Sequence, residues 1–343
     1  MLAAGNEPDF RTISDFRKIH LKTLEGFFEE VLQISLEAGR MKLGRVALDG
    51  TKIKANASKH KAMSYDRMRQ QEKAIREQVN ELLSRAAATD AEEDARYGKD
   101  QRGDEVPEEL RRRESRLKRI REAKKAVEQR AREKAKAQGK PVEDAKPEDK
   151  DQYNFTDPES RIMKSSEGFV QAYNAQAVVE ADFQLIVGQT VTQAANDKEQ
   201  LRPMVETTQQ QSGQRPEELL ADSGYCSEKN LEYLDAAADP EKRIGAYLAT
   251  GRQKHGETPP VAARGPLPKD ATRVDRMRRK LQTKAGAAIY AARKAIVEPV
   301  FGQIKQARGF RRFSLRGLSK VRAEWAFVCL THNILKLYRL CYA

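Results

Sequence analysis

Cysteine is scarce in this chain of 343 residues, which contains only Cys226, Cys329 and Cys341. No two of them form a Cys-x-x-Cys pair, so the sequence offers neither a zinc-binding framework nor a disulfide framework. We therefore interpret them as reduced thiols of a cytosolic protein. Long hydrophobic runs are also missing, because no apolar stretch reaches the roughly 18 residues that would span a bilayer. The first residues lack the basic flank and apolar stretch of a signal peptide, and we expect no membrane partner.

Acidic residues are outnumbered, with 51 Asp and Glu against 64 Lys and Arg, which gives a formal net charge of +13. This excess favours a polyanionic partner, although charge alone does not separate nucleic acid from a membrane surface. The length suffices for one large domain with an insertion or for two domains.

The first part of the chain combines a helical pattern with a short strand. Apolar residues recur at helical spacing over residues 9–40, which predicts a helix. Residues 45–49 then form a short apolar run that ends on Asp49, which predicts a strand. Gly50 follows and is expected to form a turn or a bulge.

Aromatic residues are almost absent from residues 59–150, which are rich in Glu, Lys, Arg, Ala and Gln. Apolar residues at steps of three, four and seven predict a helical hairpin with a narrow coiled-coil seam. The seam is expected to contain Met68, Ile75, Val79, Leu82, Leu110, Leu117, Ile120 and Val127. A polar break lies near residues 98–103, and residues 138–152 resemble a linker. The alternative is a partly disordered charged insertion.

The second half of the chain alternates strand and helix patterns. Strands are predicted at 168–179, 183–187, 190–192, 218–222 and 243–248, helices at 197–212, 228–237 and most of 272–340, and a loop at 252–270. A mixed sheet with helices on its faces accommodates this order. Within the last helical stretch, Trp325, Phe327, Leu330, Ile334, Leu335 and Leu337 are expected to form a buried closing helix.

Three separated carboxylates stand out in this basic chain: Asp49, Asp222 and Glu298. Asp49 and Asp222 each follow a predicted strand, and ligands gather at the carboxyl ends of strands in open sheets. Neighbouring strands lie about 4.8 Å apart, so these two acids could share ions spaced about 3.5–4 Å. Oxygen ligands suit magnesium or manganese. Taken alone, Asp49 is more simply explained by ordinary turn chemistry, and Asp222 has the same alternative explanation.

Helical spacing places Lys294, Glu298 and Lys305 near one face, where a carboxylate could hold a metal while the lysines hold phosphates. The alternative is a surface ion pair between residues four apart. Pro299 cannot donate a hydrogen bond to the carbonyl of Ala295, so the helix either kinks or starts there.

Basic residues continue downstream of Glu298 and alternate with two aromatic residues. Arg308, Arg311, Arg312 and Arg316 surround Phe310 and Phe313. This pattern suits contacts to a phosphate backbone together with stacking on unpaired bases. Two core phenylalanines with solvated arginines are an equal alternative. His60 and His332 have no partner at metal-ligand spacing and are interpreted as structural or surface residues.

Five motifs agree in order and spacing with one known family. Residues 48–58, 168–176, 191–198, 221–227 and 297–305 resemble bacterial insertion-sequence transposases of the Asp-Asp-Glu type, and the chain is most similar to the insertion-sequence eleven-eighty-two group. The similarity runs from about residue 5 to 340. Members of the family generally carry a helical N-terminal domain, and this chain resembles one that opens at the tail of that domain.

The resemblance implies a ribonuclease-H-like core, a mixed five-stranded sheet flanked by helices, with a charged helical hairpin inserted after the first strand. The implied core is 45–58 with 153–343, the implied insertion and linker are 59–152, and 1–44 is the implied helical remnant. Asp49, Asp222 and Glu298 would be the metal-binding triad. Tyr290, Arg293 and Lys305 would complete the family signature, with Lys294 as the rival of Arg293 because Arg293 lies one residue too far from Glu298.

The implied activity is phosphodiester hydrolysis and strand transfer on DNA, with two Mg²⁺ or Mn²⁺ ions bridged by Asp49. The DNA contacts would come from Tyr290, Arg293, Lys294, Lys305, Arg308, Arg311, Arg312 and Arg316. The expected partners are element ends, target DNA and further copies of the chain, in the cytoplasm at the nucleoid. The alternatives are an inactive remnant that binds DNA or sister subunits, and a nuclease of the same fold.

Overall fold

The computed structural model describes residues 9–97, 108–143, 145–165, 168–235, 239, 243–251 and 265–342. Its contacts divide the chain into two units, which we call the core unit (residues 1–56 and 163–343) and the hairpin unit (residues 57–162). Each unit is described by itself below.

The core unit is built on a mixed sheet, as expected from the order of the predicted elements. Its strands are β1 (Arg45–Lys54), β4 (Arg161–Ser165), β5 (Gly168–Glu180), β6 (Ile186–Thr192), β7 (Glu218–Ala221) and β8 (Gly245–Leu248). They lie in the order β4-β5-β1-β7-β8, and β6 also pairs with β5. β1 is antiparallel to β5 and parallel to β7, and β8 is parallel to β7. The sheet thus has six strands in the described part of the chain, one more than expected.

Two details of the strand prediction were wrong. The first is that β4 was not predicted. It has no strong alternating apolar pattern, and it joins the sheet by pairing with the long strand β5. The predicted strands at 183–187 and 190–192 are one strand, β6, which begins only at Ile186 because a turn precedes it. Glu180 stabilises this turn: its buried carboxylate accepts hydrogen bonds from the backbone amides of Asp182, Phe183 and Leu185 at 2.8–2.9 Å.

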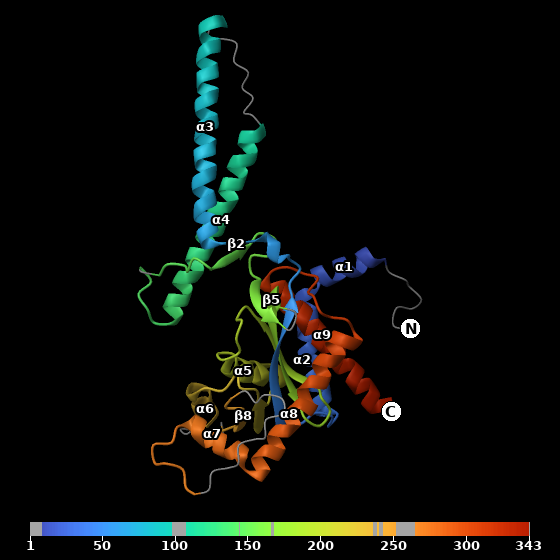
Figure 1. The fold of residues 1–343 in the computed structure, drawn as a ribbon. Coiled ribbons are helices and arrows are strands. Elements are labelled where there is room, and N and C mark those ends of the chain that lie inside the picture. The colour runs from blue at the N-terminus through green and yellow to red at the C-terminus, as the bar shows by residue number, and fades with distance from the viewer. Residues whose placement is uncertain are drawn as a thin grey trace. The chain divides into compact units, whose positions relative to one another are not determined.

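The helices of the core unit cover both faces of the sheet (Figure 1). They are α1 (Phe10–Ile19), α2 (Leu21–Glu37), α5 (Leu201–Ser212), α6 (Glu228–Asp235), α7 (Arg273–Gln282), α8 (Lys284–Gly302) and α9 (Leu318–Tyr342), and a π-helical turn, Gln303–Ala307, follows α8. α5 packs against the face that carries Gly188, because a side chain at Gly188 would collide with Thr208 of α5. α8 packs on the opposite face, which carries Asp49.

The predicted helix over residues 9–40 is two helices that meet at His20. The residue His20 has φ −103° and ψ 20°, which is outside regular helix geometry and interrupts the hydrogen-bond ladder.

α9 is the closing helix that the sequence predicts, and it is attached to the sheet by side-chain hydrogen bonds. Asn333 accepts from the amide of Ile186 at 2.9 Å and donates to its carbonyl at 2.8 Å, so that backbone groups of β6 are satisfied. Trp325 is fully buried and donates to the carbonyl of Gln176 at 3.1 Å. Of the other residues expected to be buried, Leu330 is buried, Phe327, Leu335 and Leu337 are partly buried, and Ile334 is 50% exposed.

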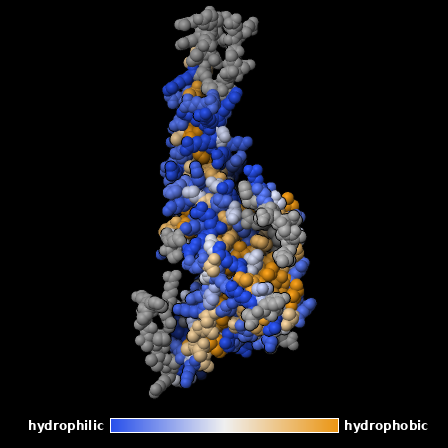
Figure 2. Space-filling model, turned by 90° about the vertical axis from the view of Figure 1, so that its right-hand side faces the viewer, coloured by the Kyte–Doolittle hydropathy of each residue, from blue (hydrophilic) through white to orange (hydrophobic). Residues whose placement is uncertain are grey.

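The hairpin unit contains two long helices, α3 (Tyr65–Tyr97) and α4 (Glu108–Ala137), beside a small antiparallel sheet of β2 (Ala62–Ser64) and β3 (Gln152–Asn154). A short 3-10 turn, η1 (Lys59–Lys61), precedes β2. The seam residues expected from the sequence pack between the helices, with Leu82 partly buried and Ala123 in addition. The surface of the hairpin is mostly hydrophilic, as a two-helix unit with one apolar stripe requires (Figure 2). The polar break at 98–103 lies outside the described residues.

Of the helices that the structure describes, none combines the length and the hydrophobicity that a membrane crossing requires.

Candidate active site

Asp49 lies within β1 and not at its end, so the predicted strand of residues 45–49 was too short. The reason is that β1 has different partners along its length. Its parallel pairing with β7 stops at Leu48 opposite Ala221, whereas its antiparallel pairing with β5 continues to Lys54. Asp49 and Asp222 are therefore the residues that directly follow the last parallel pair. This register places Asp49 of β1 beside Asp222, the residue that follows β7.

Gly50 is a strand residue and not the turn that the sequence suggested, because it pairs with Gln176 in β5. What requires glycine here is the close approach of neighbouring side chains. A Cβ at this position would collide with the amide nitrogen of Gln176 and would lie 2.8 Å from the carboxylate of Asp197.

Asp222 begins a tight turn after β7. Its Oδ1 accepts a hydrogen bond from the amide of Gly224 at 2.8 Å, which is the turn chemistry considered from the sequence. The carboxylates of Asp49 and Asp222 also interact electrostatically, because Asp222 is one of the groups that raise the pKa of Asp49. Asp222 can therefore stabilise this turn and also lie beside Asp49 in a shared site.

Arg293 connects the third acid to the first. Its guanidinium lies 3.1 Å from Oδ2 of Asp49 and 4.0 Å from Oε1 of Glu298, and the residue is 9% exposed. Lys294, the alternative considered from the motif spacing, is exposed to solvent. The basic residue in contact with the acids is therefore Arg293.

Pro299 does not end the helix, because α8 runs from Lys284 to Gly302 with the proline inside it. Glu298 and Arg293 consequently belong to one element. The carbonyl of Ala295, which would have accepted the missing N–H of Pro299, accepts instead from the side chain of Gln184 at 2.8 Å. The turn between β5 and β6 thereby stabilises α8 next to the acids.

The pKa of Asp49 is raised to about 6, chiefly by burial; Arg293 and the amide of Gly50 lower it, and the charge of Asp222 adds to the rise. Burial also raises the pKa of Tyr290, against the lowering influence of Arg293. A carboxyl group whose pKa is raised by desolvation is stabilised in its ionised form by any cation that approaches it. The electrostatics at Asp49 therefore favour a bound cation.

A fourth acid, Asp197, lies on the other face of β1. Its Oδ1 accepts hydrogen bonds from Asn174 at 2.6 Å and Gln176 at 2.7 Å, and Lys52 lies 3.6 Å away. Tyr225 donates to the other end of the Gln176 amide, so that a buried polar network supports this part of the sheet. Reasoning from single residues missed Asp197. The available signal was that Asp197, Asn174 and Gln176 all lie within motifs shared with the resembled family.

A basic cavity of about 280 Å³ adjoins β1 beyond Asp49. It is lined by Gly50, Thr51, Lys52, Lys54, Ser165, Val170, Lys305 and Arg311. Lys305, from the π-helical turn after α8, donates to the hydroxyl of Thr51. Four cationic side chains therefore line a cavity that begins at Gly50, next to Asp49 in the sequence, and one of them, Lys52, is paired with Asp197.

The comparison with known families agrees with this geometry. The family model for the transposase DDE domain matches residues 42–334. The chain belongs to this family. The matched range contains all three acids, Arg293 and Lys305. No curated protein and no solved structure matches the sequence.

The remaining basic residues proposed for DNA contact in this DDE transposase differ in their surroundings. Arg308 donates to the hydroxyl and to the carbonyl of Thr331 in α9, both at 2.9 Å. Arg316 donates to the carbonyl of Asn56 at 2.9 Å, and Arg311 to that of Lys305 at 3.2 Å. Arg312 is exposed and its backbone bridges to Lys54 of β1. These contacts fix the segment 308–316 beside β1, and Arg308 is directed toward α9.

The two aromatic residues of this segment are packing residues. Phe313 is 1% exposed and meets the ring of Tyr173 edge to face at 5.9 Å. Phe310 lies against both Phe313 and Trp325. The structure therefore supports the alternative in which the two phenylalanines pack in the core. The burial of Phe313 excludes its stacking on bases.

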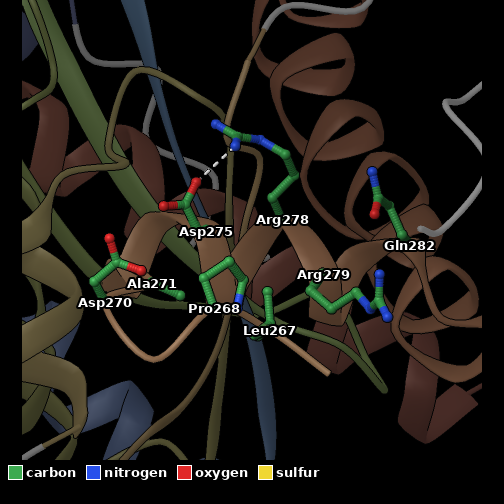
Figure 3. A pocket seen from close by; sticks show the side chains of 8 residues that line it. All are labelled: Leu267, Pro268, Asp270, Ala271, Asp275, Arg278, Arg279 and Gln282. Atoms are coloured by element: carbon green, nitrogen blue, oxygen red, sulfur yellow. Dashed lines mark hydrogen bonds and ion pairs between the residues drawn. The ribbon is translucent and has the colours of Figure 1, made fainter. Parts of the chain in front are cut away.

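A larger cavity, of about 460 Å³, lies at the start of α7 (Figure 3). Its lining comes from the single segment 267–282 and includes Asp275, which pairs with Arg278 at 2.8 Å and also forms a capping box with Thr272. None of the three acids lines it. This cavity is therefore separate from the site of Asp49, Asp222 and Glu298.

The donor set fits a divalent metal. Carboxylate oxygens are the ligands that Mg²⁺ and Mn²⁺ prefer. Asp49 supplies them from β1, and Asp222 from the segment that follows β7. Within the described part of the chain, no three acidic, histidine or cysteine side chains are grouped closely enough to hold one ion. Glu298 is 57% exposed and contacts the guanidinium of Arg293. The structure thus brings Asp49 and Asp222 together and connects Glu298 to Asp49 through Arg293.

Proposed function

We propose that this DDE transposase catalyses metal-dependent hydrolysis and strand transfer of DNA at the ends of an insertion element of the eleven-eighty-two group. The observation that supports this most strongly is the register of β1 and β7, which places Asp49 and Asp222 side by side where the parallel pairing stops. Glu298 lies on α8 over the same face of the sheet and interacts with Asp49 through Arg293.

Asp49, Asp222 and Glu298 would hold the divalent ions, two Mg²⁺ or Mn²⁺. Such ions, when bound, lower the pKa of an attacking water or hydroxyl and stabilise the leaving oxygen. The raised pKa of Asp49 supports this assignment, because a desolvated carboxylate gains most from a nearby cation.

The basic groups beside the acids would position the DNA strand. The cavity lined by Lys52, Lys54, Lys305 and Arg311 offers cationic side chains for phosphate oxygens along β1, where Gly50 and Thr51 follow Asp49. Arg293 orients Asp49 through their ion pair, and the buried network of Asp197, Asn174, Gln176 and Tyr225 supports β1 from the other face. Tyr290, Lys294, Arg312 and Arg316 would contribute to the same DNA surface.

Assembly on DNA as a dimer or higher oligomer, at the nucleoid in the cytoplasm, completes the proposal. The alternative is a chain that binds DNA or sister subunits without cleaving. DNA cleavage distinguishes the two possibilities, since only the first requires the carboxylates.

The test is nicking of a supercoiled plasmid that carries the DNA flanking the coding region, with Mg²⁺ or Mn²⁺ present. Asp222→Asn keeps the size of the side chain and removes its charge, so we expect nicking to fall at least about 100-fold while DNA binding persists. Asp182→Asn is the matched control, because it makes the same change at an exposed acid in the turn between β5 and β6.

Equal nicking by wild type and Asp222→Asn would reject the catalytic assignment. Binding without nicking by the wild type would favour the non-catalytic alternative. Strand-transfer products, detected by joining of a labelled end to a second plasmid, separate a transposase from a nuclease.

A further inference from the structure

A cavity of about 410 Å³ lies in the hairpin unit, and Asp49, Asp222 and Glu298 are not among its lining residues. Its basic lining residues are His60, Lys61, Arg67, Arg112, Arg116 and Arg119. Met63, Ile120 and Phe155 add apolar surface. No acidic residue of the described chain lines this cavity, which we call the hairpin cavity.

The fold concentrates these cations on one side of the hairpin. Arg112, Arg116 and Arg119 are four and three residues apart on α4, which places them on one face of that helix. Arg67 lies in the first turn of α3, and Lys61 ends the 3-10 turn η1. The cluster therefore draws on three elements that the small sheet of β2 and β3 fixes at the base of the hairpin.

The charge of the hairpin cavity is only partly balanced within the hairpin unit. Arg112 pairs with Glu108, and Arg119 lies over the ring of Phe155 at 5.6 Å. Arg116 donates to the neutral side chain of Gln71 at 3.3 Å.

Two acids of these helices are engaged with other groups. Glu72 pairs with Arg121 at 3.0 Å and Lys124 at 3.1 Å, and Glu128 accepts from the hydroxyl of Tyr65 at 2.8 Å. Several cations that share one cavity repel each other, and a bound anion relieves this repulsion. The cavity therefore suits an anionic ligand.

We propose that the hairpin cavity is a second DNA site, which binds a phosphate of the DNA strand between Arg67 and Arg116 and the adjoining sugar or base against Met63 and Phe155. The combination of guanidinium groups and an aromatic surface is what a nucleotide requires, since its phosphate is charged and its base is flat and apolar on its faces. This inference rests on the proposed function only in taking DNA as the partner. The cavity contains no residue of the catalytic set.

The experiment measures binding of a fluorescent oligonucleotide to the full chain by anisotropy, in EDTA so that no cleavage occurs. Arg67→Glu combined with Arg116→Glu reverses two charges in the cavity. We expect at least about tenfold weaker binding and a salt dependence whose log–log slope is shallower by about one, because the phosphate held between the two arginines is no longer neutralised. Duplex and single-stranded probes are compared, so that the strand form that the cavity prefers is identified.

The matched control is Lys118→Glu combined with Lys125→Glu, which makes the same change of charge at exposed positions of α4 outside the cavity. We expect this pair to weaken binding by less than about threefold, since only long-range attraction is lost. Equal losses in the two pairs, or an unchanged Kd in the cavity pair, would overturn the proposal. Thermal melts show whether the variants are folded, and both arginines are exposed, so we expect little change in stability. The neutral pair, Arg67→Gln with Arg116→Gln, must also weaken binding, because it removes both cations without adding negative charge. Absence of any DNA binding by the wild type would instead reject the proposed function, and this site with it.

Discussion

At the scale of single residues, Gly50 shows how tightly the site is packed. A Cβ there would collide with Gln176, which is fully buried and fixed by Asp197 and Tyr225. Gly50→Ala must therefore displace the network that supports β1. We expect a loss of about 1–3 kcal/mol in the free energy of unfolding, the range of overpacked positions, and reduced nicking. Urea denaturation monitored by circular dichroism measures the change.

Gly26→Ala provides the comparison for this prediction. Gly26 lies in α2, and nothing would lie within 4 Å of a new Cβ, so alanine should be neutral or stabilising there. If Gly50→Ala unfolds at the same urea concentration as wild type, the packing argument is wrong.

At the scale of elements, α8 depends on a side chain from a distant turn. Gln184, at φ 59°, donates to the Ala295 carbonyl that Pro299 leaves without a helical donor, and accepts from Lys336 of α9 at 2.7 Å. We expect Gln184→Ala to cost about 1 kcal/mol of stability, the net value of an ordinary hydrogen bond. In a Pro299→Ala background, residue 299 has an N–H that can bond to Ala295, so the same substitution should cost less.

A double-mutant cycle measured by urea denaturation tests this coupling. The four proteins are wild type, Gln184→Ala, Pro299→Ala and the double variant. A coupling energy indistinguishable from zero would show that water satisfies the Ala295 carbonyl equally well and that Gln184 is not what stabilises the helix at Pro299.

The elements also show what sequence can and cannot predict. The mixed sheet and its flanking helices were predictable, because the apolar patterns that bury them are local. The length of β1 was not, since the strand continues beyond its pairing with β7 through contacts with β5 and, at Lys54, with Arg312, and these residues carry the polar side chains of the site. The same holds for Asp197: its contacts with Asn174 and Gln176 cross more than 20 residues and leave no periodic pattern. Phe313 was ambiguous because burial of an aromatic residue among arginines depends on Tyr173, which is distant in sequence.

At the scale of the whole molecule, the two units have separate hydrophobic cores. The hairpin core consists of residues from α3 and α4, whereas residues such as Leu219 of β7 are fully buried in the sheet. Proteins with separate cores open in separate cooperative steps. The hairpin should therefore lose its structure without loss of the carboxylate site.

This independence predicts a reciprocal pattern of hydrogen exchange. Leu117→Ala removes a hairpin core side chain that is 8% exposed, and Leu219→Ala removes one from the sheet that is 0% exposed. Either change is expected to cost about 2–5 kcal/mol in its own unit. Mass spectrometry should show faster amide exchange in α3 and α4 for Leu117→Ala, with β1 and β5 unchanged, and the reverse for Leu219→Ala. Faster exchange throughout both units in either variant would mean that they unfold as one, and a DNA-binding defect of hairpin variants would then have to be separated from damage to the site around Asp49.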